Sequence, residues 1–138
     1  MKKDLNMINQ NIPSILKSAK NIAIIGISDK PNRASHSIGL YLVRAGYNIF
    51  PVNPNLKQVL GLKCFNNLSE IKESMDIVDI FRRPEYVTPI AKEAIQISAK
   101  TIWMQAGIIN EEAASMALDA GLNVIMDRCI KVEHSLLF

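Results

Sequence analysis

The sequence has no apolar run that approaches the roughly 18 residues a membrane-spanning helix needs. Its first residues, MKKDLNMINQNIPSILK, lack the continuous apolar stretch and the small-residue cleavage site of a signal peptide. It has only two cysteines, Cys64 and Cys129, without C-x-x-C spacing, which argues against a zinc site and against a disulfide framework. We therefore expect a cytoplasmic protein without a metal and without a membrane partner.

A large excess of charge of one sign is absent as well. The chain carries 16 Lys and Arg residues against 13 Asp and Glu residues, a formal net charge of +3. This excess is too small to indicate nucleic-acid binding, but it suits a local site for a phosphorylated ligand. The sequence also lacks internal repeats and Gly-, Ser- or Pro-rich linkers, so we expect one domain over residues 1–138.

Short apolar runs alternate along the chain with stretches of helical periodicity. The apolar runs predict strands over 22–27, 48–52, 77–81, 101–105 and 123–127. Helices are expected over 12–19, 35–45 and 69–74, from Pro84 onwards, and between Asn110 and Gly121. Such alternation with short connections predicts an α/β fold, an open and mainly parallel five-stranded sheet with helices on both faces.

In a fold of this kind, ligands bind at the carboxyl ends of the strands. After the first predicted strand the chain reads GISDKPNRASHS, which begins like a G-x-G-x-x-G dinucleotide fingerprint and then departs from it. Ser28 stands where the second glycine belongs, and two cations, Lys30 and Arg33, lie in the loop. The helix that follows presents unpaired N–H groups that suit a phosphate. We predict a phosphate site here; the alternative is a Gly26 needed only for packing and two solvated cations.

The end of the second strand lacks a carboxylate. Proteins that bind NAD usually place Asp or Glu there to hold the ribose hydroxyls. This chain has Asn53 followed by Pro54, so an anionic group on the ribose is tolerated and Lys30 or Arg33 can pair with it. The ligand would then carry the 2′-phosphate of NADP or the 3′-phosphate of coenzyme A. A plain Asn-Pro turn without ligand contact is the alternative.

The third and fourth strand ends offer further contacts. Phe81 is placed to flank an adenine, and Arg82 and Arg83 are placed to stack on it or to pair with a phosphate. Met104 is placed to line an apolar wall facing the ligand, whereas Trp103 is assigned to the core. Two adjacent arginines on a loop are also common as plain surface charge.

The fifth strand end, MDRCIKVEH, is dense in polar groups. Cys129 and His134 are the types of residue that form a nucleophile and its base. No third residue that would orient them is identifiable, and nearness in sequence does not bring two side chains into one site. We therefore assign no catalytic residue and no metal ligand.

Four segments resemble the small stand-alone CoA-binding proteins: the run from IAIIGISDK to FPVNP, then DIVDIFRRPEYV, WMQAGIINEEAA and AGLNVIMDRCIKVEH. These proteins are single Rossmann-like domains, similar to the CoA-binding domain of the succinyl-CoA synthetase α subunit. The resemblance extends over about residues 13–135. It implies a Rossmann-like three-layer domain that binds coenzyme A across the carboxyl edge of its sheet.

The resemblance also implies which residues meet the ligand. In that family the first loop holds phosphate, the second and third strand ends approach the adenosine, and the fourth faces the pantetheine or the pyrophosphate. The residues carried over on this basis are Gly26, Ile27, Ser28, Lys30, Arg33, Asn53, Pro54, Phe81, Arg82, Arg83, Met104 and Gln105.

The expected function is to bind a small-molecule ligand, CoA or an acyl-CoA, without catalysis by the chain itself. The phosphohistidine of the synthetase lies in another domain, so its reaction is not carried over. Two enzymatic alternatives stay open, an NADP-binding reductase and an acyl-transfer enzyme that uses Cys129. A further alternative is a regulatory protein that senses CoA and docks on another protein, whose identity the sequence does not indicate.

Overall fold

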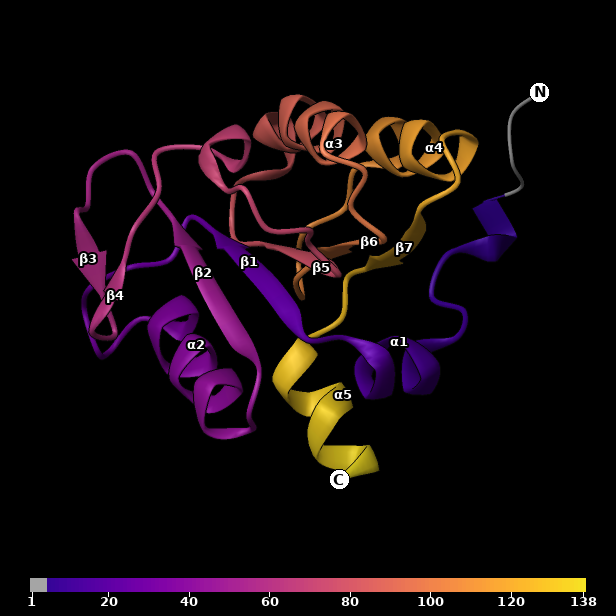
Figure 1. Ribbon diagram of the computed structural model, residues 1–138. Coiled ribbons are helices and arrows are strands. Elements are labelled where there is room, and N and C mark those ends of the chain that lie inside the picture. Colours follow the sequence, from indigo (N-terminus) through magenta and orange to yellow (C-terminus); the bar gives the residue numbers. More distant parts are fainter. Residues whose placement is uncertain (1–4) are drawn as a thin grey trace.

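A five-stranded parallel sheet forms the centre of the computed structural model, which describes residues 5–138 (Figure 1). Every neighbouring pair of strands in it runs parallel. The spatial order is β2 (Asn48–Val52), β1 (Asn21–Ile25), β5 (Ile77–Ile80), β6 (Thr101–Met104) and β7 (Asn123–Met126). The three central strands are buried on both faces because helices cover both, and apart from Asn21, Asp79 and Thr101 their residues are apolar, which confirms the interpretation of the apolar runs.

Helices form the two outer layers (Figure 1). On one face lie α3 (Val87–Gln96) and α4 (Glu111–Asp119); on the other lie α1 (Ile12–Ser18), α2 (Ala34–Arg44) and α5 (Ile130–Leu137). Alternate residues of each strand pack into the hydrophobic cores on opposite sides of the sheet, because successive side chains point to opposite faces. In β1, for example, Ala23 and Ile25 pack on the α3 and α4 side, and Ile22 and Ile24 pack on the other. The predicted three-layer fold is confirmed.

Three short 3-10 helices complete the chain: η1 (Leu5–Met7), η2 (Leu68–Glu70) and η3 (Pro84–Tyr86). No helix within residues 5–138 is long and apolar enough to cross a membrane.

Three segments differ from the sequence-based expectations. The helix expected over 69–74 is the single turn η2, because the backbone becomes extended at Ile71, whose side chain is buried in the core. The irregular segment after Pro54 contains a small antiparallel hairpin, β3 (Gln58–Val59) and β4 (Leu62–Lys63), which turns through Leu60 and Gly61 with positive φ. The polar stretch after β7 enters α5, which buries Ile130 and His134.

Candidate functional site

Gly26 follows β1 directly and lies where the carboxyl ends of three neighbouring strands meet. Its amide donates a hydrogen bond to the carbonyl of Val52 at the end of β2 (2.9 Å), and its φ is +83°. A Cβ at this position would collide with the carbonyl oxygen of Phe81 and lie 2.9 Å from Cδ of Arg82. The chain itself therefore requires glycine at position 26, whatever the loop binds.

The loop after Gly26 is held by its own side chains. The hydroxyl of Ser35 accepts a hydrogen bond from the amide of Ser28 (2.9 Å), and the hydroxyl of Ser28 accepts one from the amide of Lys30 (3.1 Å). The N-cap residue of α2, Arg33, makes no side-chain cap. The side chain of Arg33 therefore does not occupy the N–H groups of the first turn. The amide of His36 is hydrogen-bonded to the carbonyl of Arg33 (3.1 Å), while Ala34 and Ser35 line an open surface beside Lys30 and Arg33.

An open cleft of about 410 Å³ lies at this helix terminus. We call it the α2 cleft. Six of its ten lining residues follow three different strand ends and were predicted from the sequence. The other four were not predicted as site residues. It is lined by Gly26, Ser28, Asp29, Lys30, Arg33, Ala34, Ser35, Asn53, Leu56 and Phe81.

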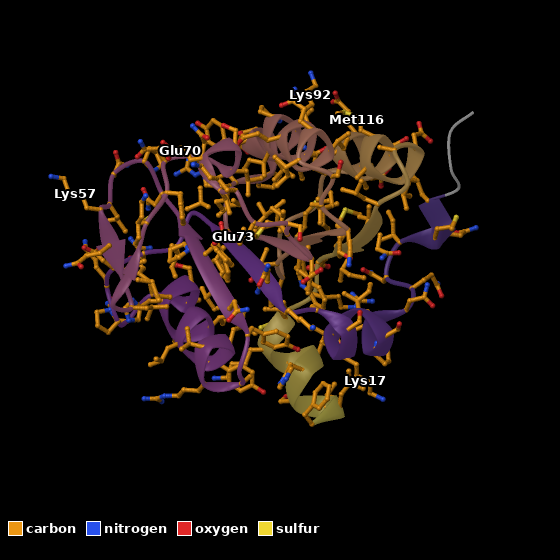
Figure 2. All side chains as sticks on the ribbon, viewed as in Figure 1. Lys17, Lys57, Glu70, Glu73, Lys92 and Met116 are labelled. Carbon is orange, nitrogen blue, oxygen red and sulfur yellow. The ribbon has the colours of Figure 1, made fainter. Side chains whose placement is uncertain are left out.

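The α2 cleft carries two positive charges and one negative charge. Lys30 and Arg33 are exposed and bring two full positive charges, while the exposed Asp29 brings one negative charge that the sequence analysis did not consider. Lys57 follows Leu56 in the chain but extends outward beside β3 (Figure 2). The net positive charge of the cleft thus comes from the loop after β1.

The side chain of Asn53 is hydrogen-bonded to the backbone around it. Its side-chain nitrogen donates a hydrogen bond to the carbonyl of Ile27 (2.9 Å), and its side-chain oxygen accepts one from the backbone amide of Asn55 (2.9 Å). The second contact is the Asx turn that the sequence left open as an alternative. Asn53 also lines the α2 cleft, so it can hold the loop in shape and still leave the strand end free of negative charge.

A second, smaller cleft of about 160 Å³ lies on the other side of Gly26, towards α3. We call it the α3 cleft. Two predicted residues, Pro54 and Arg82, enter it, and Gly26 is shared with the α2 cleft. The sequence analysis missed Asn66, Asn67 and Glu93, because they arrive from the segment after β4 and from the middle of α3. The complete lining is Ile25, Gly26, Val52, Pro54, Asn66, Asn67, Leu68, Arg82, Ile90 and Glu93.

The two adjacent arginines have different surroundings. The guanidinium of Arg82 lies 5.0 Å from the centre of the Tyr86 ring, a cation–π contact, and its side chain lines the α3 cleft. Arg83 is exposed at the N-cap of η3 and does not line either cleft within the described chain. Phe81 is half-buried, packs against the core on the α2 side and shows part of its ring to the α2 cleft.

Three side chains predicted at the site are buried. Met104 is 0% exposed and belongs to the core on the α3 and α4 side, so it does not form the apolar wall expected of it. Gln105 is 4% exposed, and its side-chain oxygen accepts a hydrogen bond from the amide of Ile130 at the start of α5 (3.1 Å). Ile27 is 0% exposed and packs in the core on the α2 side, which leaves only its backbone near the cleft.

Cys129 and His134 have separate environments. Cys129 is the half-buried N-cap of α5, and five residues along a helix place His134 on a different side of it. The Nδ1 atom of His134 is hydrogen-bonded to the hydroxyl of Tyr41 (2.8 Å), and its ring stacks on Phe138 (4.5 Å between centroids). Burial lowers the pKa of His134. The imidazole thus contacts three aromatic rings, those of Tyr41, Tyr47 and Phe138.

Asp79, in the central strand β5, was not noticed in the sequence. It lies in register between Ile24 of β1 and Trp103 of β6, on the face of the sheet that α2 and α5 cover. It is 0% exposed, and its carboxyl oxygens have no hydrogen-bond partner within residues 5–138. Burial raises the pKa of Asp79 well above its ordinary value, which favours the uncharged acid.

Comparison with known proteins decides the family. The model of the family described as CoA binding domain matches residues 20–135. The chain belongs to this family. It is 43% identical over 130 residues to the uncharacterized protein YneT of Bacillus subtilis, a match that covers 94% of this chain and 96% of YneT.

Solved structures agree with the fold of this CoA-binding domain family member. A hypothetical protein from Pyrococcus horikoshii superimposes with a TM-score of 0.91 at 34% identity and covers 99% of this chain and 97% of its own. A larger relative, an ADP-forming acetate–CoA ligase of Archaeoglobus fulgidus, is 28% identical over 95 residues. That match covers 67% of this chain but only 14% of the ligase.

Proposed function

We propose that this protein binds coenzyme A across the carboxyl edge of its sheet, without catalysing a reaction itself. The observation that carries the proposal is the α2 cleft, in which the amino end of α2, Lys30 and Arg33 converge on one open surface. Coenzyme A carries a pyrophosphate and a 3′-phosphate, and replacing their hydration takes several charge-assisted hydrogen bonds. Membership of the CoA binding domain family supports the same ligand.

Each of the two clefts binds a different part of coenzyme A. In this proposal the phosphates occupy the α2 cleft, where first-turn amides and two cations are available. The adenosine lies across Gly26 towards Pro54 and Arg82, whose cleft has apolar walls from Val52 and Ile90. The pantetheine then passes over the next strand ends, those of β5 and β6, because the ligand crosses the sheet edge in strand order.

The acetate–CoA ligase is named for a reaction, but this chain spans only 14% of that protein. We therefore propose the binding of CoA and not the ligase reaction. The Cys129 and His134 environments described above give no support to an acyl-transfer role for Cys129.

Titration calorimetry with CoA, dephospho-CoA, NADP and NAD tests this function. We expect CoA to bind most tightly and dephospho-CoA to bind about tenfold more weakly, because it lacks the 3′-phosphate and its charge-assisted bonds. Binding of NADP as tight as that of CoA would favour the reductase alternative. No detectable CoA binding by a folded protein would refute the proposal.

A further inference from the structure

Two large apolar side chains are exposed at the carboxyl edge of the sheet, close to the α3 cleft. Tyr86 in η3 is 48% exposed, and Ile109 in the loop between β6 and α4 is 51% exposed. We propose that the physiological ligand is an acyl-CoA with an apolar acyl group, and that this group packs on Tyr86 and Ile109. The inference rests on the proposed function, and it names the class of thioester that the same site prefers.

Two contacts of Arg82 join Tyr86 to the junction of the clefts. Cδ of Arg82 approaches Gly26 at the junction of the two clefts, and the guanidinium of Arg82 lies over the ring of Tyr86. Arg82 therefore links the loop that would hold the phosphates to the ring of Tyr86.

The Asn110 side chain ties the loop that carries Ile109 to the segment that carries Tyr86. Its amide nitrogen donates to the carbonyl of Pro84 (2.9 Å) and contacts the hydroxyl oxygen of Thr88 (3.1 Å), while its oxygen caps α4 by accepting from the amide of Ala113 (2.9 Å). These bonds fix the loop after β6 to the start of α3. The segments that carry Tyr86 and Ile109 are thus held together by hydrogen bonds.

The order of the strands puts Tyr86 and Ile109 where the thiol end of the proposed ligand would lie. The α2 cleft lies at β1 and β2, whereas Tyr86 follows β5 and Ile109 follows β6 (Figure 1). A CoA molecule whose phosphates lie at the amino end of α2 would direct its thiol towards β5 and β6. Two side chains are too few for a stable protein interface, which buries about 800 Å² on each partner, but they suit a short hydrocarbon chain.

The test compares the binding of CoA and hexanoyl-CoA by calorimetry in three proteins. In the unaltered protein we expect hexanoyl-CoA to bind about tenfold more tightly than CoA, the gain from burying about two methylene groups. In Ile109→Ser that advantage falls below about threefold, while the affinity for CoA itself is unchanged. The control is Val132→Ser on α5, because Val132 is also 51% exposed and lies away from both clefts. This variant should keep the full advantage.

Three results would overturn the inference. Equal affinities for the two ligands in the unaltered protein would show that no acyl surface exists, and the proposed CoA binding would still stand. An equal loss of both affinities in Ile109→Ser would show that the surface serves the pantetheine rather than the acyl group. Absence of CoA binding in the unaltered, folded protein would refute the proposed function and this inference with it.

Discussion

Gly26 and Arg82 come from strands that are distant in the sequence, and yet a Cβ on Gly26 would lie 2.9 Å from Cδ of Arg82. The same Cβ would collide with the carbonyl oxygen of Phe81. The ends of β1 and β5 are therefore packed backbone to backbone at the junction of the α2 and α3 clefts. Glycine at position 26 therefore keeps a side chain of its own out of the junction, where only the Arg82 side chain approaches from β5.

Gly26→Ala should destabilise the protein. We expect a loss of about 2–4 kcal/mol in the free energy of unfolding, measured by urea denaturation, from a strained positive φ together with the collision at Phe81. Gly107→Ala is a matched control, because its φ of +84° is nearly the same while its Cβ would meet open space. A loss in Gly107→Ala as large as that in Gly26→Ala would show that the close approach adds no cost.

Arg33→Ala should weaken CoA binding by about three- to tenfold, since an exposed charge-assisted bond contributes less than a buried one. Calorimetry at low and at high salt checks this, and the difference between the two proteins should shrink as salt screens the charge. Arg44→Ala is the control, because Arg44 is exposed in the last turn of the same helix, about 15 Å from its start. Equal affinities of the two variants at low salt would remove Arg33 from the site.

Asp79→Leu should stabilise the protein at neutral pH by more than about 1 kcal/mol, because it removes a buried carboxyl that has no hydrogen-bond partner in the described part of the chain. The folded-state pKa of Asp79 is raised, so the unfolded chain releases this proton at a lower pH than the folded chain does. Stability in the unaltered protein is therefore lost as pH rises above the ordinary aspartate value of 3.8 towards the raised pKa.

Urea denaturation of both proteins at several pH values between about 4 and 8 measures this difference. The advantage of Asp79→Leu should be smallest near pH 4, the value in this range closest to the ordinary aspartate pKa of 3.8, where Asp79 of the unfolded chain is still partly protonated, and it should grow with pH. A constant difference across this range would contradict a raised pKa for Asp79.

Much of the fold could be predicted from the sequence because parallel strands buried on both faces are continuous apolar runs. All five strands of the sheet lie where such runs occur, within one or two residues at their ends. The helix expected between Asn110 and Gly121 is α4, and Asn110 is its N-cap, whose side chain accepts a hydrogen bond from the amide of Ala113. The β3 and β4 hairpin was missed because its turn, Leu60–Gly61, lacks the Asn-Gly or Asp-Gly signal that usually marks one.

The candidate site was predictable in part. Strand ends indicate which loops share an edge, so Lys30, Arg33 and Asn53 were expected near one another, and all three line the α2 cleft. The position of a residue at a strand end does not show whether its side chain is free. Met104 is covered by the core, and Gln105 caps a helix that the sequence analysis did not predict.

The sequence by itself determined the alternation of strand and helix, and hence the edge at which a ligand is expected, because both follow from local hydrophobic periodicity and from the rules of parallel sheets. Only the tertiary structure decided which side chains that edge exposes. It brought Glu93 of α3 to the α3 cleft, tied the loop that carries Ile109 to η3 through Asn110, and buried Asp79 without a hydrogen-bond partner among residues 5–138. Such outcomes depend on packing between segments far apart in the chain, which periodicity along one segment does not record.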